Sequence, residues 1–265
     1  MAMETGLSGK VALVAAASKG LGFAIAEALA AEGAALAICA RGEAGLNKAR
    51  EALARTAAGP VHAVAADVSR IDGIQRVVDS TLERFGRVDV LVTNAGGPPV
   101  GLFDAMDWNQ WQQAVDLTLR SAVEMTRGVL PGMRERRWGR VIHVTSLTVK
   151  QPIDGLMLSA SIRAAVTGFS RTLANEVASE GITVNTILPG FMNTDRVVEL
   201  AEATAAREGL AVEAIQSRTR NQIPMRRIGE PRELAALATF LASEQASYIT
   251  GQSIAVDGGW IRGLL

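Results

Sequence analysis

The sequence predicts a single α/β domain in which a doubly wound parallel sheet carries helices on both faces. Short apolar runs alternate with longer helical patterns along the chain, and strands joined through helices pair in parallel by right-handed crossovers. A length of 265 residues, 48% of them hydrophobic, suits one large core. No repeat, low-complexity tract or linker divides the chain, so we expect one domain over residues 1–265.

Seven strands are expected, separated by helical stretches. They cover residues 11–15, 36–40, 61–65, 88–93, 140–145, 182–188 and 253–256. Ligands of a doubly wound sheet bind at the carboxyl ends of its strands, so the site should lie there. The segment from Phe191 to about Ile228 is long and charged and has no strand pattern. We expect it to form a helical lid over the substrate cleft.

Composition and charge favour a small-molecule ligand. Lys and Arg total 27 and Asp and Glu also total 27, so no net field draws the protein to nucleic acid or to an anionic membrane. The N-terminus lacks the features of a signal peptide, and charged residues interrupt the apolar stretch 11–40, so we expect a cytoplasmic protein without a membrane span. The single cysteine, Cys39, lies in an apolar run, which predicts a buried, inert thiol. No metal site is expected.

A glycine-containing turn and a helix follow the first strand. Unpaired backbone N–H groups and the helix dipole form an anion site of the kind that holds a pyrophosphate. Gly20 and Gly22 let the backbone approach such a ligand closely. An ordinary tight turn between strand and helix is the alternative. The candidate contacts are Ala16, Ser18, Lys19, Gly20, Leu21 and Gly22.

With this turn the sequence resembles the short-chain dehydrogenase/reductase family, whose turn usually reads Thr-Gly-x-x-x-Gly-x-Gly. Ala15 and Ala16 replace the Thr-Gly pair here. The resemblance runs from Lys10 to Gly259 and includes, in order, Asp67-Val68, Asn94-Ala95-Gly96, Pro189-Gly190 and the segment from Tyr248 to Gly259. It implies a Rossmann-like fold in which these loops bind a nicotinamide dinucleotide and Asp67 contacts the adenine. We expect Ala16 to weaken binding, because its methyl group lies near the adenosine ribose.

The end of the second strand predicts NADP(H) rather than NAD(H). NAD-specific sites of this type usually have an acidic residue there, which holds the ribose hydroxyls. Ala40 occupies that position and Arg41 follows it, with Lys19 as a second cation in the turn. A guanidinium with a nearby ammonium suits the 2′-phosphate of NADP. Two solvated surface cations are the alternative.

The resemblance also locates the catalytic positions. The family uses a serine after the fifth strand, a tyrosine and a lysine in the next helix, and an asparagine in the preceding long helix. Ser146 matches the serine, whereas Ser159, Arg163 and Thr118 stand where the tyrosine, lysine and asparagine are expected. The active site is therefore divergent, with Ser-x-x-x-Arg in place of Tyr-x-x-x-Lys.

These replacements preserve positioning better than proton transfer. A serine hydroxyl is a far weaker acid than a tyrosine hydroxyl, so Ser159 can hydrogen-bond but scarcely titrate. Arg163 stays charged and can bind the nicotinamide ribose or stabilise a developing alkoxide. Lys150 is a candidate substitute acid beside the cleft, and a solvated loop lysine is the alternative. His143 is expected to be a packed strand histidine.

Basic and apolar segments bear on substrate and partners. The lid mixes arginines, Arg196 among them, with acidic residues, which is typical of a solvated helix face and only suggests an anionic substrate. The basic run 134–140 resembles a patch of 3-oxoacyl-[acyl-carrier-protein] reductases, and a helix end complementing its dipole explains it equally well. The apolar tail from Trp260 to Leu265 should be buried against another subunit, in the homotetramer that the family commonly forms.

Three functions are compatible with these residues. The first is an NADP-dependent oxidoreductase (EC 1.1.1.-) that acts on a small carbonyl or alcohol, a 3-oxoacyl group or similar, with an atypical proton donor. The second is a catalytically silent NADP(H)-binding protein that acts as a sensor or as a partner in an oligomer. A third keeps the fold and carries out cofactor-independent hydration or elimination. Fold alone does not decide between them.

Overall fold

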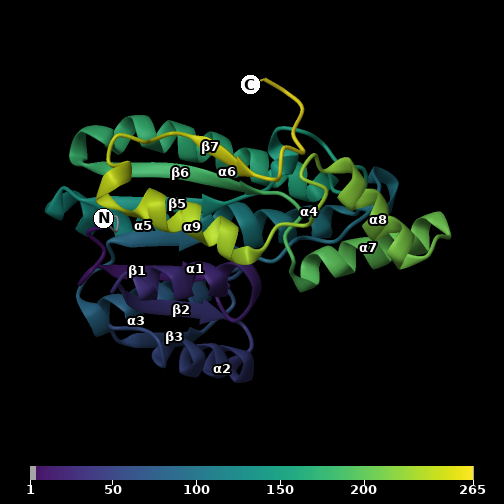
Figure 1. Ribbon diagram of the computed structural model, residues 1–265. Coiled ribbons are helices and arrows are strands. Elements are labelled where there is room, and N and C mark those ends of the chain that lie inside the picture. The colour runs from purple at the N-terminus through teal and green to yellow at the C-terminus, as the bar shows by residue number, and fades with distance from the viewer. Residues whose placement is uncertain (1–3, 265) are drawn as a thin grey trace.

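The computed structural model describes residues 4–264 and has the predicted doubly wound sheet. Its strands are β1 (Val11–Ala15), β2 (Ala35–Ala40), β3 (Val61–Ala65), β4 (Val90–Thr93), β5 (Gly139–Val144), β6 (Ile182–Pro189) and β7 (Ser253–Val256). All neighbouring strands are parallel and lie in the order β3-β2-β1-β4-β5-β6-β7. Figure 1 shows this single sheet between its helices.

The strand ends differ slightly from the sequence-based expectation. The pairing register with β1 starts at Val90, and the Asp89 side chain before it accepts a hydrogen bond from the Val11 backbone N–H. Thr145 lies just past β5, and β6 extends to Pro189 beside β7. These shifts leave every predicted strand in place and move only its boundaries.

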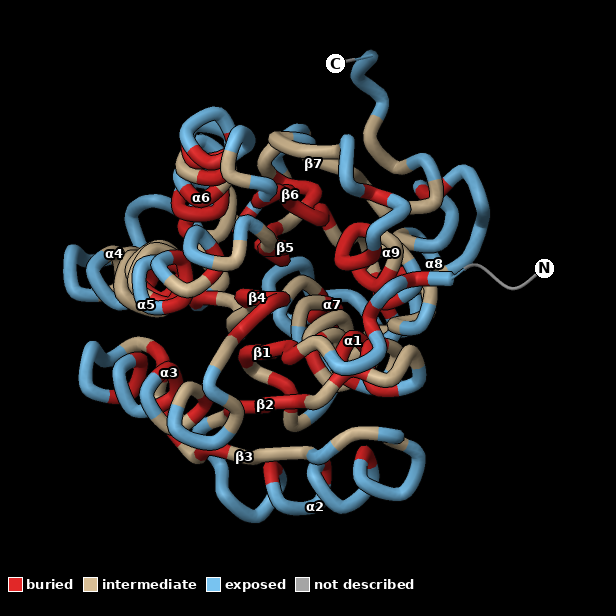
Figure 2. Tube along the Cα trace, turned by 90° about the vertical axis from the view of Figure 1, so that its left-hand side faces the viewer, coloured by how far each residue is buried: buried red, intermediate tan, exposed pale blue. Residues whose placement is uncertain are grey.

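Helices cover both faces of the sheet, as Figure 2 shows from the end of the strands. One face carries α1 (Gly20–Ala31), α2 (Glu43–Ala54) and α9 (Pro231–Ala242). The other face carries α3 (Ile71–Phe85), α5 (Ser121–Arg136) and α6 (Met157–Val177). The remaining helices are α4 (Trp108–Ala114), α7 (Asp195–Glu208) and α8 (Val212–Gln222).

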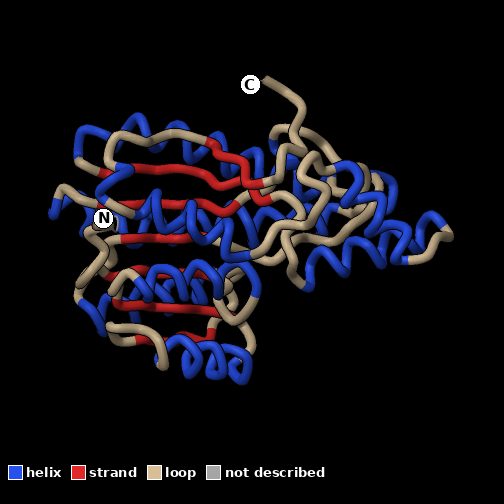
Figure 3. Tube along the Cα trace, in the orientation of Figure 1, coloured by secondary structure: helices blue, strands red, loops and turns tan. Residues whose placement is uncertain are grey.

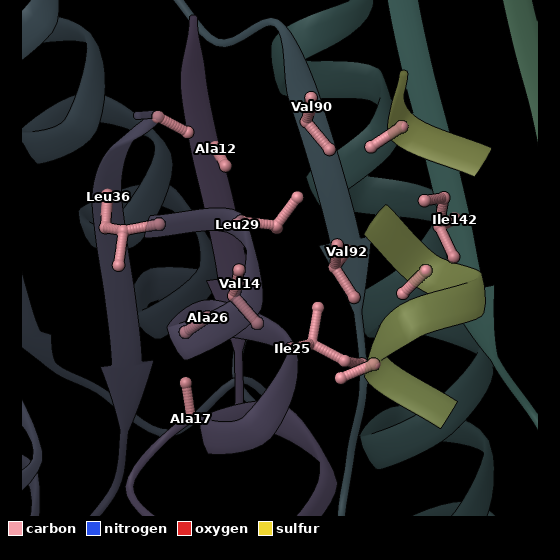
Figure 4. Close-up of a cluster of buried hydrophobic side chains, with 14 of the residues drawn as sticks. Ala12, Val14, Ala17, Ile25, Ala26, Leu29, Leu36, Val90, Val92 and Ile142 are labelled. Atoms are coloured by element: carbon pink, nitrogen blue, oxygen red, sulfur yellow. The ribbon is translucent and has the colours of Figure 1, made fainter. Parts of the chain in front are cut away.

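The core follows from the alternation of side chains along each strand. Ala12 and Val14 pack on the face of α1 and α9, whereas Leu13 and Ala15 pack on the face of α3 and α5. Figure 4 shows the first of these clusters, with α1 lying across β1, β2 and β4. Because both faces are covered, the central strands are apolar at nearly every position. Cys39 is among these buried residues, and burial raises the pKa of its thiol to about 12, as its predicted inertness requires.

The segment expected to form the lid is helical. It consists of α7, α8 and connecting loops without a strand, and these two helices extend beyond the carboxyl ends of the strands (Figure 3). At the C-terminus, Trp260 is partly buried against Phe191, with ring centroids 5.9 Å apart, and Leu264 is fully exposed. Leu265 lies outside the described residues. Within residues 4–264 no helix is long and apolar enough to cross a membrane.

Candidate active site

A cavity of about 810 Å³ opens where the strands end, between the sheet and the start of α7. Its volume lies in the range of ligand sites in proteins, roughly 300–1,000 Å³. All but one of the residues predicted to bind the cofactor line it. They are Ala16, Ser18, Lys19, Gly20, Leu21, Arg41, Asp67, Val68, Asn94, Ala95, Gly96, Arg163, Pro189 and Gly190.

The turn between β1 and α1 owes its shape to three small residues, Ala16, Gly20 and Gly22. Gly20 begins α1 in a left-handed conformation, with φ +60°. Gly22 does not line the cavity, and its role as a ligand contact stays a prediction. A side chain there would collide with the carbonyl of Ala16, so Gly22 lets the helix pack against the turn.

Ala16 has a backbone conformation that explains why the family has glycine at this position. Its φ is +50°, in the left-handed region that costs an L-residue roughly 1–2 kcal/mol. From the sequence, only the methyl group near the ribose was expected to weaken cofactor binding. The backbone strain is a second cost, and no property of the sequence other than the family's glycine indicates it.

The two cations predicted to recognise a 2′-phosphate lie in different surroundings. Lys19 Nζ is 2.6 Å from the Asp195 carboxylate, and this hydrogen bond and the carboxylate's charge raise the lysine pKa. Arg41 is exposed and forms no ion pair with any residue from 4 to 264. The pKa of Asp67 is lowered although partial burial opposes this, because Ser69 donates to it and Arg41 lies nearby. Arg41 is therefore the cation available to a phosphate.

At the other end of the cavity, Ser146 after β5 and Ser159 of α6 both line the wall. Ser146 follows β5, and its Oγ accepts hydrogen bonds from the Thr148 backbone N–H at 3.2 Å and the Thr148 hydroxyl at 2.9 Å. With its lone pairs occupied in this way, the Ser146 hydroxyl proton is free to point into the cavity. Ser159, in the first turn of α6, is half-buried and also lines it. Thr148 is a positioning residue that the sequence reasoning missed.

Arg163 is buried beneath these serines. One guanidinium nitrogen donates to the carbonyls of Val144 and Thr145 at 3.0 and 2.8 Å, and the other donates to Ala95 at 3.3 Å. Burial, reinforced by the charge of Arg196, lowers the pKa of Arg163 to about 10, so the side chain is still charged at neutral pH. No carboxylate within residues 4–264 pairs with it. Arg163 thus ties β5 to the loop after β4 and brings an uncompensated charge to the cavity wall.

Thr118 lies behind Arg163 in a π-helical turn, Val115–Arg120, that joins α4 to α5. Its buried Oγ1 has no hydrogen-bond partner among the described residues. It faces a second cavity of about 10 Å³ that Thr93 and Arg163 also line, a volume that admits about one water molecule. π-helical turns are frequent at functional sites. The position predicted for the family's asparagine therefore does adjoin the catalytic end.

Two predicted candidates lie away from the cavity. Lys150 is exposed and is absent from the cavity wall, which Thr148 lines but Val149 does not. In the basic run 134–140, Arg134 pairs with Glu180 and Arg140 with Glu244. Lys150 therefore fits a solvated loop lysine, and the ion pairs of the basic run fit a structural role for that segment.

The lid contributes Arg196, which the sequence offered only as one of several arginines. Its guanidinium donates to the carbonyl of Pro98 at 2.8 Å and lies so close to Gly97 that a side chain there would collide with it. Arg196 and Arg163 line the same cavity. Sequence spacing alone did not indicate that these two arginines line one cavity, because they lie on separate helices.

Comparisons with known proteins agree with this geometry. A family model described as Enoyl-(Acyl carrier protein) reductase matches residues 15–261. The 3-oxoacyl-[acyl-carrier-protein] reductase of Vibrio cholerae is 38% identical over 253 residues, which cover 96% of this chain and 98% of that protein. The corresponding enzyme of Escherichia coli is 36% identical over 251 residues, 95% of this chain and 97% of that one.

Solved structures are similar over nearly the whole chain. The L-sorbose reductase of Gluconobacter frateurii, complexed with NADPH and L-sorbose, has a TM-score of 0.93 and 36% identity and covers 99% of this chain and 100% of its own. An actinorhodin polyketide ketoreductase with NADPH has a TM-score of 0.92 and 31% identity, with 99% and 100% covered.

Proposed function

Since this chain belongs to the short-chain dehydrogenase/reductase family, we propose that it is an NADP(H)-dependent reductase of a small carbonyl substrate, with an atypical proton donor. One observation carries the proposal. The nucleotide-binding loops and the group Ser146, Ser159 and Arg163 line one continuous cavity. The reductases of similar structure that were solved with NADPH support the cofactor assignment.

The residues present fit this cofactor. The N-terminus of α1 and the left-handed Gly20 leave backbone N–H groups facing the cavity, where a diphosphate would bind. Arg41, exposed and without an ion pair among residues 4–264, is placed to hold a 2′-phosphate. Asn94, Ala95 and Gly96 line the same cavity and would lie beside the nicotinamide ribose. When bound, NADPH supplies the hydride.

The protein's own groups act on the carbonyl oxygen. Ser146, oriented by Thr148, donates a hydrogen bond to that oxygen and thereby polarises the carbonyl. Arg163 stabilises the negative charge that develops there, and it is not a proton donor because it stays charged. Ser159 is a second hydrogen-bond donor. The proton comes from water, and the small cavity that Thr118 and Arg163 line has room for about one such molecule. Loss of a tuned general acid lowers a rate by about 10² to 10⁴, so we expect slow turnover.

The lid and the oligomer complete the proposal. The helical segment 191–228 covers the substrate, since Val197 and Leu200 of α7 line the cavity. We also propose a homotetramer, supported by the family and by the exposed Tyr248 and Leu264. Light scattering on the purified protein measures this, and a monomer at micromolar concentration contradicts it.

Activity on a panel of ketones, aldehydes and oxo acids with NADPH tests the function. Wild type is compared with Ser146→Ala, Ser159→Tyr and the matched surface control Lys150→Ala. We expect slow activity that Ser146→Ala abolishes and Lys150→Ala leaves unchanged. Activity insensitive to Ser146→Ala would exclude this site.

The second candidate is a silent NADP(H)-binding protein. Its support is the hydrogen bonding of Arg163, which donates to three backbone carbonyls as a structural residue would. This function predicts tight NADPH binding, no wild-type activity with any carbonyl, and activity only in Ser159→Tyr.

A further inference from the structure

The charges that line the cavity are unevenly distributed. Its acidic residues are Asp67 and Asp195, and its basic residues are Lys19, Arg41, Arg163 and Arg196. Asp195 pairs with Lys19, and Asp67 lies near Arg41 at the end where the adenosine binds. Among the described residues, the catalytic end therefore has two cations on its wall and no acidic side chain.

Both catalytic-end arginines are held in place by the loop after β4. Arg163 donates to the carbonyl of Ala95 and Arg196 to that of Pro98, at 3.3 and 2.8 Å. The Arg196 guanidinium also packs directly over Gly97. Its only carboxylate partner in residues 4–264 is Glu199, at 3.3 Å, whose side chain is 59% exposed. Surface pairs of this kind contribute little, so an incoming anion can replace Glu199.

The cofactor does not supply the missing anion at this place. The N-terminus of α1, where Thr194 lies over Gly20, would hold its diphosphate, and Arg41 would hold its 2′-phosphate. Arg196 is the second residue of α7, and its guanidinium donates to the carbonyl of Pro98 rather than contacting the phosphate turn. The anion that balances these two arginines must therefore be part of the substrate, which accepts the hydride.

We propose that the substrate is an oxo acid, whose carboxylate is bound by Arg196 while its carbonyl lies between Ser146 and Arg163. A guanidinium presents paired donors that match a carboxylate. Ile153, Leu156, Val197 and Leu200 supply apolar wall in the same cavity, which suits a short hydrocarbon chain. This inference rests on the proposed function and specifies its substrate class. Burial is the main cause of the lowered pKa of Arg163, and the positive charge of Arg196 adds to it. A bound anion relieves the repulsion between the two arginines.

Binding to the protein saturated with NADP⁺ tests this without requiring turnover, because the oxidised cofactor cannot reduce an oxo acid. Calorimetry compares unbranched 2-oxo and 3-oxo acids with their methyl esters. We expect at least one acid to bind about tenfold or more tightly than its ester. Arg196→Gln should reduce that ratio to near one, Arg196→Lys should retain part of it, and NADP⁺ affinity should be unchanged.

The matched control is Arg220→Gln, which removes one exposed positive charge from α8, outside the cavity. It should leave the preference for the acid intact. Equal binding of acids and esters overturns the proposal, as does a preference that survives Arg196→Gln. If Arg196→Gln weakens NADP⁺ and acid equally, the residue belongs to the cofactor site and the proposal is wrong. Acid-selective binding without any hydride transfer would overturn the proposed reaction and leave the carboxylate site standing.

Discussion

The two ends of the cavity use different parts of the chain, because backbone groups form the phosphate end and side chains form the catalytic end. At the phosphate end, Ala15 and Ala16 replace the usual residues, and the turn, the helix N-terminus and the neighbouring loops keep their arrangement. At the catalytic end, Thr118, Ser159 and Arg163 lie in the π-helical turn and in α6, where the resemblance to the family predicts an asparagine, a tyrosine and a lysine. Similar substitutions thus have unequal chemical consequences.

The difference lies in which atoms act. Backbone N–H groups and a helix dipole bind a diphosphate, and they persist when side chains change, provided that the turn keeps its conformation. General acid catalysis depends on the pKa of one side chain, which a serine cannot reproduce. We therefore expect nucleotide binding to survive side-chain changes that slow proton transfer.

The strongest test of this contrast restores the family's acid. Ser159→Tyr combined with Arg163→Lys should raise the reduction rate by about 10² to 10⁴, because a tyrosine beside a lysine ammonium regains a tunable proton. The steady-state rate with NADPH measures this. Ser159→Phe with Arg163→Lys is the control of equal bulk. An increase in both double variants would mean that space, not the proton, limits the reaction.

The next effect concerns a histidine buried behind the catalytic end. His143 Nδ1 lies 2.6 Å from the Thr93 hydroxyl, and burial lowers the pKa of His143 to about 4. Because the folded state binds fewer protons than the unfolded state, stability is full above pH 6.5 and falls as the pH drops toward 4. The loss is at most about 3 kcal/mol. Urea unfolding across this window should show it, and His143→Asn should flatten the slope. An unchanged slope in that variant would contradict the assignment.

At the phosphate end, Arg41→Gln should weaken NADPH binding by about tenfold to a hundredfold, the effect of losing one charge-assisted hydrogen bond. Binding of NADH should not change. Lys19→Gln is the matched comparison and should have a smaller effect, because Lys19 is already paired with Asp195. Nicotinamide fluorescence titrations of the wild type and both variants, each with NADPH and with NADH, measure these affinities. A larger effect at Lys19 would reverse the assignment of the phosphate site.

The smallest effect is expected from Ala16→Gly, which removes the left-handed strain. We expect a gain of about 0.5–1 kcal/mol in unfolding free energy, since the strain released exceeds the added chain entropy. Thermal unfolding measures it. The control Ala17→Gly, at a fully buried neighbour without positive φ, should destabilise the protein. Equal effects at both positions would show that Ala16 is not strained.

The sequence predicted all seven strands, because short apolar runs between helical stretches reflect burial that the sheet then provides on both faces. It also placed Ser146, Ser159 and Arg163 at one cavity, through a resemblance that fixes their register. It missed the positive φ of Ala16, the pairing of Lys19 with Asp195 and the approach of Arg196 to the loop after β4. These features depend on contacts between residues distant in the chain, which leave no local pattern. Lys150 was a candidate only because sequence distance from Ser146 cannot show in which direction a loop turns.

The most direct test of the central claim is the transfer of deuterium from NADPH labelled at the reactive C4 position. The protein is incubated with the labelled cofactor and a mixture of carbonyl compounds, and the products are analysed by mass spectrometry. We predict an alcohol carrying one deuterium at the former carbonyl carbon, formed by the wild type and absent with Ser146→Ala. Tight NADPH binding without deuterium in any product would contradict the account.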